Sequence, residues 1–317
     1  MKDIITDNYG EMDVKKKKGL IHDLKINKAY YLMLLPVLIY FIVFSYVPMG
    51  GLVIAFQNFR PANGIFGSSF VGFKNFIDFF NSVYFGRVLR NTIIISLLSL
   101  LICFPLPIIF ALLLNEVKRL RFKKAVQTIT YMPYFISLVV LAGIIIDFTS
   151  SDGLLGGTLM TALTGESKNL LADPKYFRAI MTVSELWQSL GYSSIIYVAT
   201  LSAVDQELYE AAAIDGANRW QQTIHITIPE ISSTIIIMLI LKCGTMLAVG
   251  AEKIILLYNA NIYETADVIS TFVYRKGLQE FNYGYSTAVG MFNSVINFVL
   301  IVVANKLAKK FSDTNLF

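Results

Sequence analysis

The feature that most constrains this chain is a series of long apolar stretches that are almost free of charge. A helix crossing a bilayer needs about 20 apolar residues, because the hydrocarbon core is about 30 Å thick and each residue rises about 1.5 Å. Backbone groups in lipid must pair within the protein, so each stretch is predicted to be a helix. Six stretches reach this length: residues 29–59, 91–115, 125–146, 186–204, 231–251 and 281–305.

The composition also indicates a membrane protein. Hydrophobic residues make up 55% of the chain and charged residues 15%, against about 25% charged in an ordinary soluble domain. The net charge is +5, but the basic residues cluster at the ends of the apolar stretches, which argues against a nucleic-acid partner. We therefore predict an all-α, polytopic membrane domain over residues 29–312, with a basic segment at 1–28 and a tail at 313–317.

Lysine and arginine predict the orientation of the spans. They concentrate before the first stretch, between the second and third (residues 118–124), and after the sixth. With six spans these three regions lie on one side, which the positive-inside rule makes the cytoplasm. Both termini are then cytoplasmic, and the connections at 60–86, 151–178 and 259–280 face outward.

A short polar segment, EAAAIDGANRWQQTIHITIPE, occupies residues 210–230 on the predicted cytoplasmic side. The residues up to Asp215 are good helix formers, and Gly216 suits a turn. An amphipathic pattern resumes at Arg219, and Pro229 fits the first turn of the next helix. The sequence therefore predicts helix, turn and helix over about residues 205–224.

This segment is thin and carries two acids. Its small residues leave it narrow enough to enter a groove, where Glu210 and Asp215 can make charge-assisted contacts. The small residues are Ala211, Ala212, Ala213 and Ala217. On physical grounds alone, a capped connector between two spans explains the segment equally well.

The spacing within the segment resembles the EAA motif of ABC importer permeases, EAA-x3-G-x9-I-x-L-P. The residues that occupy its positions are Glu210, Ala211, Ala212, Gly216, Ile226, Ile228 and Pro229, with Ile228 in place of the usual leucine. Asp215, Ala217 and Trp220 fit the form common in sugar permeases, although Thr223 stands where many of those carry phenylalanine.

The resemblance extends to the maltose-type permease family, in its oligosaccharide and polysaccharide branch. It includes FVGFKNFIDFF at residues 70–80 and AEKIILLYNANIYETADVISTFVYRKGL at residues 251–278. It covers about residues 25–312, without the large periplasmic insertion of the maltose permease. It implies six transmembrane helices in the type I ABC importer permease fold, in a bacterial plasma membrane.

The resemblance also implies a function and partners. The segment would be a coupling helix that docks on a separate ATPase subunit, where ATP and Mg bind, so this chain carries no cofactor and is not an enzyme. The partners would be a second homologous permease, two ATPase subunits and an extracellular solute-binding protein, which delivers an oligosaccharide for import by alternating access. Glu210 and Gly216 would be foremost in coupling, supported by Ala211, Ala212, Ala213, Asp215 and Ala217.

The residues themselves offer no catalytic chemistry. The sequence contains no GxxxxGK[ST] phosphate loop, no HExxH and no GxSxG, so we predict neither catalytic nor metal-binding residues. It contains only two histidines, His22 and His225. His225 is expected to be a solvated residue beside the segment rather than a ligand.

Polar residues inside the spans are candidates for the solute pathway, because they are costly there. Lys242 lies roughly 16 Å into the fifth span by helical rise. It either pairs with a structural partner or faces the pathway, and in the second case it favours an anionic sugar. Asn293 and Asn297 share one face of the sixth span and either line the pore or bond across helices.

A further cluster begins the fourth span. Aromatic faces and planar hydrogen-bonding groups together suit a sugar site, although aromatic residues also anchor helices at the membrane interface. The cluster consists of Glu185, Trp187, Gln188 and Tyr192.

Two rival functions stay open. An ABC permease for another solute, such as an amino acid or phosphate, would carry the same motif. An ion-gradient secondary transporter would need paired carboxylates within the spans, which the sequence does not show. A signalling or scaffold protein would leave the motif spacing unexplained.

Overall fold

The computed structural model describes residues 27–311. The predicted tail at 313–317, and all but the last two residues of the predicted basic segment at 1–28, lie outside the described residues. The chain divides into two compact units, Met1–Val53 and Ile54–Phe317. Each unit is described by itself.

The first unit is an apolar helical rod within its described part. It consists of α2 (Lys28–Phe41), the wide π-helical turn η1 (Ile42–Tyr46) and α3 (Val47–Met49), and the 3-10 helix η2 (Gly50–Phe56) continues it into the second unit. None of its described side chains before residue 54 is buried. A helix that is apolar all round and not covered by protein suits a lipid environment.

The second unit is built almost entirely of helices. Its α-helices are α4 (Gly64–Gly67), α5 (Lys74–Phe80), α6 (Phe85–Leu98), α7 (Pro105–Asn115), α8 (Leu120–Tyr131), α9 (Leu138–Thr149), α10 (Met160–Thr164), α11 (Pro174–Leu201), α12 (Gln206–Ile214), α13 (Arg219–Gln222), α14 (Ile228–Gly244), α15 (Ala251–Leu257), α16 (Tyr263–Ala266), α17 (Ile269–Tyr274) and α18 (Tyr283–Phe311). Short 3-10 or π-helical turns join them: η3 (Pro61–Asn63), η4 (Ser99–Cys103), η5 (Met132–Phe135), η6 (Leu154–Leu159), η7 (Leu170–Ala172), η8 (Thr223–Thr227), η9 (Ala260–Ile262) and η10 (Arg275–Gln279). The strands β1 (Gln57–Asn58) and β2 (Ser69–Phe70) pair antiparallel, with Gln57 opposite Phe70.

Within residues 27–311, five helical segments are long and apolar enough to cross a membrane. They are Lys28–Phe56, Phe85–Asn115, Leu138–Thr164, Arg219–Gly244 and Tyr283–Lys310. Four of them overlap the predicted first, second, fifth and sixth spans, and the fifth span begins and ends earlier than predicted. The polytopic, all-helical class predicted from the sequence is therefore confirmed.

The predicted third span, one helix over residues 125–146, is wrong. The chain leaves the helix after Tyr131 through η5, which contains Pro133, and residues Ile136 and Ser137 are extended. A new helix, α9, then begins at Leu138, where the Ser137 side chain accepts a hydrogen bond from the Val140 N–H. A proline that cannot donate to the preceding turn and a serine N-cap together explain the break.

The predicted fourth span lies inside α11, which is 28 residues long. It is not among the five apolar segments, because Glu185, Gln188 and several serines lower its hydropathy. A helix packed among other helices need not be apolar on every face. The number of six spans therefore stays a prediction.

Wide π-helical turns precede three prolines. Pro48, Pro105 and Pro229 each lie in the first turn of an α-helix. The π-helical turns that precede them are η1, η4 and η8, respectively. A proline ring collides with the carbonyl four residues earlier, and a widened turn relieves that collision without ending the helix. Pro229 sits in the first turn of α14, as the sequence predicted.

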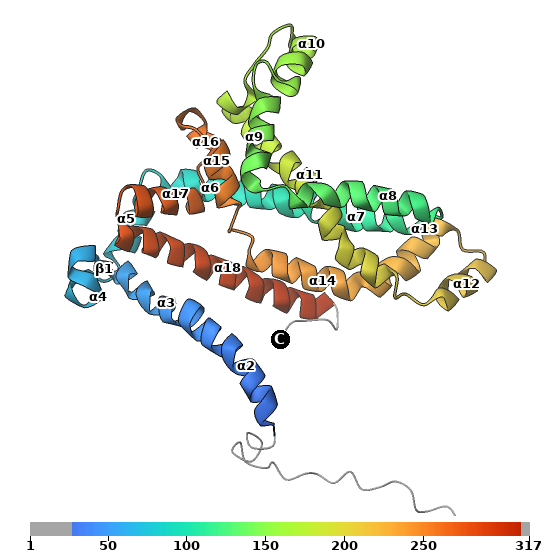
Figure 1. Cartoon of the computed structure of the whole chain (residues 1–317), viewed down its shortest axis with the longest axis horizontal. Coiled ribbons are helices and arrows are strands. Elements are labelled where there is room, and N and C mark those ends of the chain that lie inside the picture. Colours follow the sequence, from blue (N-terminus) through green and yellow to red (C-terminus); the bar gives the residue numbers. More distant parts are fainter. Residues whose placement is uncertain (1–26, 312–317) are drawn as a thin grey trace, which may run out of the picture. The chain divides into compact units, whose positions relative to one another are not determined.

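Helix α11 is the centre of the second unit. It packs against α7, α8, α14 and α16, and its apolar residues enter two separate cores. Phe177 and Met181 join a core with α6, α9 and α15, whereas Tyr197 and Leu201 join one with α7 and α14. In Figure 1, α14 and α18 run alongside each other beneath this helix.

The contact between α11 and α8 depends on a glycine. A Cβ added to Gly191 would lie 2.2 Å from the Thr130 carbonyl oxygen and 2.8 Å from the Tyr131 ring. We expect Gly191→Ala to destabilise the protein by about 1–3 kcal/mol, the usual cost of overpacking. Thermal unfolding of the detergent-solubilised protein measures this. The control is Gly290→Ala on α18, where an added Cβ has no neighbour within 4 Å; equal melting temperatures for the two variants would contradict the expectation.

Candidate functional site

The predicted helix–turn–helix at residues 205–224 is present. Helix α12 begins after Asp205, whose side chain accepts a hydrogen bond from the Glu207 N–H. The helix ends at Ile214, and α13 begins at Arg219. The acid before the helix satisfies one of its free N–H groups, as an N-cap does.

The turn depends on Gly216, which has a φ of +81°. The Gly216 N–H donates to the Ala213 carbonyl, and the Ala217 N–H donates to the Ala212 carbonyl. This pair of bonds is the Schellman pattern that ends a helix at a left-handed residue. Glycine takes that conformation without the strain that a side chain adds.

The second half of the segment is fixed by a capping box and by contacts to other elements. Asn218 accepts a bond from the Gln221 N–H, and the Gln221 side chain accepts one from the Asn218 N–H. The Tyr209 hydroxyl lies 3.0 Å from that of Thr227. An ion pair of 2.7 Å joins Arg219 to Glu116, just past the end of α7. The turn is therefore a rigid, fully capped element.

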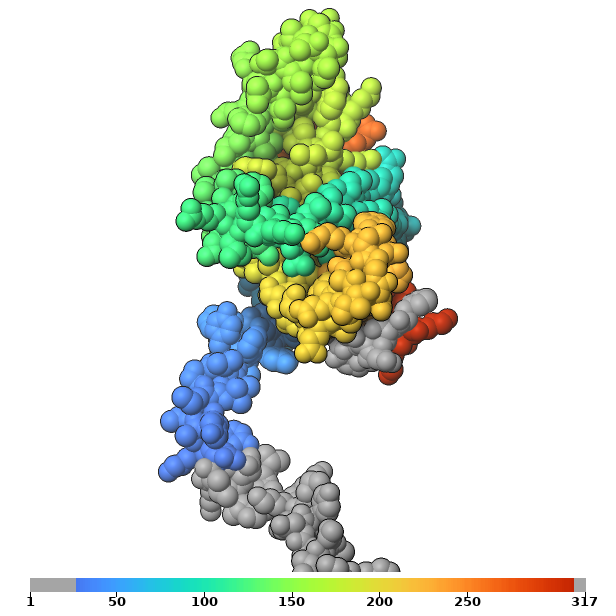
Figure 2. Space-filling model, turned by 90° about the vertical axis from the view of Figure 1, so that its right-hand side faces the viewer, coloured from blue at the N-terminus to red at the C-terminus, as the bar shows by residue number. Residues whose placement is uncertain are grey.

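The segment is exposed, and Figure 2 shows it in yellow and orange at the surface of the second unit. Glu210, Ala211, Ala213, Asp215 and Gly216 are exposed, whereas Ala212 and Ala217 are half-buried. His225 is exposed beside them, as predicted.

Two large apolar side chains on the segment also face outward. Ile214 is 87% exposed and Trp220 is 72% exposed. Exposed apolar groups beside charged ones are typical of a surface that another protein covers. Ile214 is not among the residues predicted from the sequence, although it lies between the alanines and the turn.

A second site lies where α14 ends. The helix ends at Gly244, seven residues before the predicted end of the fifth span. Residues 245–247 form a turn, and residues 248–250 have no regular secondary structure. Irregular backbone at membrane depth is tolerated where it lines a cavity. A cavity of about 450 Å³ lies here, lined by Ser96, Ser99, Leu138, Met181, Glu185, Gln188, Lys242, Thr245, Met246, Ala248, Val249, Gly250, Ala251, Glu252 and Lys253.

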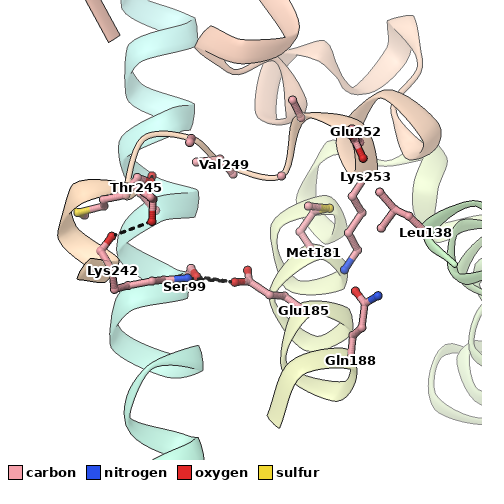
Figure 3. Close-up of a pocket in the computed structure, with 15 residues that line it drawn as sticks. Ser99, Leu138, Met181, Glu185, Gln188, Lys242, Thr245, Val249, Glu252 and Lys253 are labelled. Carbon is pink, nitrogen blue, oxygen red and sulfur yellow. Dashed lines mark hydrogen bonds and ion pairs between the residues drawn. The ribbon is translucent and has the colours of Figure 1, made fainter. Parts of the chain in front are cut away.

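Charged and polar groups meet in this cavity (Figure 3). The Glu185 carboxylate accepts a hydrogen bond of 2.7 Å from the Ser99 hydroxyl, and the Lys242 ammonium lies 3.4 Å from the same oxygen. Lys242 thus pairs with a carboxylate of its own chain and also lines the cavity. Gln188, one turn further along α11, also faces the cavity.

The structure separates the four residues predicted at the start of the fourth span. Glu185 and Gln188 line the cavity, whereas Trp187 and Tyr192 do not. Tyr192 stacks on Tyr134, with ring centroids 3.7 Å apart. The aromatic half of the predicted sugar cluster therefore lies on another face of α11.

Asn293 and Asn297 bond to the non-helical segment that follows α14 and do not line the cavity. The Asn297 side chain accepts a hydrogen bond from the Leu247 N–H at 3.0 Å, and Asn293 donates to the Leu247 carbonyl at 3.5 Å. The Ser96 hydroxyl donates to the Met246 carbonyl at 2.6 Å. These contacts satisfy backbone groups that the end of α14 leaves free.

Sequence reasoning missed Lys253, the second lysine of the cavity. It lies on α15 and is 6% exposed. The available signal was a single lysine in the apolar run AEKIILL, but its position just outside the predicted fifth span concealed it.

Comparison with known proteins agrees with this architecture. Residues 104–313 match the family described as "binding-protein-dependent transport system inner membrane component". The chain is 45% identical over 303 residues to the polygalacturonan/rhamnogalacturonan transport system permease protein YteP of Bacillus subtilis strain 168, covering 96% of this chain and 94% of that protein.

Two crystal structures are also similar. One is a bacterial ABC transporter involved in the import of the acidic polysaccharide alginate, with a TM-score of 0.85 and 42% identity over 92% of this chain and 98% of that chain. The other is a bacterial alginate ABC transporter in complex with an alginate pentasaccharide-bound periplasmic protein, with a TM-score of 0.87 and 41% identity over 94% of this chain and 100% of that chain.

Proposed function

Since the chain belongs to the family of binding-protein-dependent transport system inner membrane components, we propose that it is a permease subunit of an ATP-driven importer for acidic oligosaccharides. The chain is a multi-pass membrane protein of that family. The observation that carries the proposal is the similarity, over nearly the whole chain, to an importer of the acidic polysaccharide alginate.

The cavity at the end of α14 supports the proposal that the oligosaccharide passes through this part of the chain. Its volume of about 450 Å³ falls within the usual range of small-molecule sites, about 300–1,000 Å³. It combines polar side chains with unwound backbone, the arrangement that transporters use near the middle of the membrane. Lys242, Glu185 and Gln188 are its pathway candidates. Trp187 does not line the cavity, and Tyr192, Asn293 and Asn297 have other contacts.

The segment over α12 and α13 supports the energy coupling. It would dock on a separate ATPase subunit, with Glu210 and Gly216 at the centre and Ala211, Ala212, Ala213, Asp215 and Ala217 in contact beside them. ATP and Mg would bind on that subunit. Closure of the ATPase pair would move the docked segment, and the spans would then alternate between inward-open and outward-open states.

The proposed assembly contains this chain, a second homologous permease, two ATPase subunits and an extracellular solute-binding protein. A binding protein is part of the complex in one similar crystal structure. The basic regions before the first span and after the last support a cytoplasmic position for both termini. The coupling segment is then also cytoplasmic, where ATP is available.

Reconstitution of the complex in proteoliposomes tests the proposal. The binding protein, loaded with acidic or neutral oligosaccharides of matched length, is added outside, and ATP hydrolysis and uptake are measured. We expect the acidic oligosaccharide to stimulate hydrolysis and to accumulate inside. Uptake that an ion gradient drives without ATP, or no stimulation by any oligosaccharide, would refute the proposal.

A further inference from the structure

Lys253 is a buried cation that lines the cavity. Its side chain extends from α15 into the cavity, and Figure 3 shows its ammonium beside Gln188 of α11. Within residues 27–311, the Lys253 Nζ has no hydrogen-bond partner. An ammonium removed from water and left unpaired costs several kcal/mol. Such a costly arrangement is typical of a group kept for function.

Neither acid that lines the cavity forms a hydrogen bond or an ion pair with Lys253. Glu185 is already bound by the Ser99 hydroxyl and by the Lys242 ammonium. Glu252 also lines the cavity, but its side chain is exposed and stays at the α15 end in Figure 3, away from the Lys253 ammonium. The cavity therefore holds two lysines, Lys242 and Lys253, and the Glu185 carboxylate of α11 is paired with only the first of them.

The contact between Lys242 and Glu185 is weak enough to exchange. Its length is 3.4 Å, and the two side chains are 36% and 34% exposed. Pairs of this exposure contribute only about 0–1 kcal/mol. A second carboxylate entering the cavity can therefore bind Lys253 and compete with Glu185 for Lys242.

We propose that Lys253 binds a carboxylate of the acidic oligosaccharide during its passage through the cavity, with Glu185 limiting how strongly a second negative charge is held. This inference rests on the proposed function and assigns the importer's selectivity for acidic oligosaccharides to Lys253. Lys253 supplies a positive charge on a side chain that is itself buried, where a charge-assisted hydrogen bond is strong. Glu185 repels the same carboxylate, so the ligand is held and still released.

Lys253→Met separates this role from a structural one. Methionine has a similar length and no charge, and it removes an unpaired buried ammonium, so we expect the assembled complex to melt at the same or a higher temperature. We expect uptake of the acidic oligosaccharide to fall by about tenfold or more, as when one partner of a buried charge pair is lost. Lys253→Arg keeps the charge and should retain most of the uptake.

Two further variants complete the test. Lys175→Met, an exposed lysine at the start of α11 and outside the cavity, is the matched control and should take up the oligosaccharide as the wild type does. Glu185→Gln removes the competing carboxylate and should lower the concentration of loaded binding protein that gives half-maximal uptake. If Lys253→Met does not assemble, Lys253→Gln replaces it with the same expectation.

The outcomes distinguish this inference from the proposed function. If the wild-type complex takes up no acidic oligosaccharide, the proposed function fails. If the wild type transports it and Lys253→Met transports it within about twofold of the wild type, the proposed function stands and the role of Lys253 is overturned. A loss of uptake in both Lys253→Met and Lys253→Arg, with lower melting temperatures, would show a structural role and would equally overturn it.

Discussion

Uptake of the oligosaccharide is expected to fall about thirtyfold or more when Glu210 is replaced by alanine. The Glu210 carboxylate is exposed on α12, on a segment that is rigidly capped at both ends. If it enters a groove of the ATPase subunit, its loss leaves a donor on that subunit unpaired. Truncating one partner of a buried, hydrogen-bonded charge pair costs about 2–5 kcal/mol, and about 1.4 kcal/mol corresponds to a tenfold change.

Two measurements check this expectation. Uptake into proteoliposomes reports transport, and the amount of ATPase subunit that co-purifies with the permease reports docking. Glu230→Ala is the control, since Glu230 is also an exposed carboxylate but lies after the motif, in the first turn of α14. If Glu210→Ala and Glu230→Ala transport equally well, the segment is only a connector between two helices.

Gly216→Val is expected to disturb the same interface by straining the backbone of the turn. An added Cβ has no neighbour within 4 Å, but the φ of Gly216 is +81°. The strain is therefore conformational, about 1–2 kcal/mol for an ordinary residue in the left-handed region. We expect this variant to distort the turn, shift α12 relative to α13 and reduce co-purification of the ATPase subunit together with uptake.

The coupling segment could be predicted from the sequence because its structure is local. Asp205, Gly216 and Pro229 each specify a helix start, a helix end or a first turn through neighbours in the chain. Local rules of this kind do not depend on the rest of the fold. The break between α8 and α9 carried similar signals in Pro133 and Ser137, but the apolar run concealed them.

The cavity could not be predicted in the same way. The end of α14 at Gly244 is stabilised by Ser96 and Asn297, which lie far away in the sequence. Likewise, helical periodicity places Glu185 and Gln188 on one face of α11, but the sequence does not say which face is inward. The close approach of Gly191 to α8 helps to determine which face of α11 is turned inward, and this tertiary contact cannot be read from the sequence.

A buried ionic network is expected to dominate the stability of the second unit. Asp267 is fully buried, and its carboxylate accepts hydrogen bonds from Arg87 at 2.9 Å, Arg275 at 2.8 Å and Thr271 at 3.1 Å. Burial alone would lower the pKa of Arg275, but its hydrogen bond to Asp267 holds that pKa above the ordinary value. The network therefore joins α6, α17 and η10 through one carboxylate.

The backbone carbonyl of Asp267 connects further residues to the network. The Asn91 side chain donates to the Asp267 carbonyl at 3.1 Å, and it accepts a hydrogen bond from Arg178 of α11 at 2.9 Å. A shift of Asp267 would therefore disturb α11, which carries Glu185 and Gln188. The network supports the cavity from the predicted outer side without lining it.

Replacing Asp267 with alanine is expected to lower the free energy of unfolding by about 3–5 kcal/mol, because it leaves two half-buried arginines, Arg87 and Arg275, without the buried carboxylate that pairs with both of them. Equilibrium unfolding of the purified protein in mixed micelles measures this. The control is Glu280→Ala, which breaks the exposed pair with Lys276 and should cost less than about 1 kcal/mol. If the two variants lose similar stability, the arginines are not held by Asp267. A much larger loss of stability in Asp267→Ala than in Glu280→Ala means that the Asp267 carboxylate, through its partners on other helices, holds together the helices around the cavity.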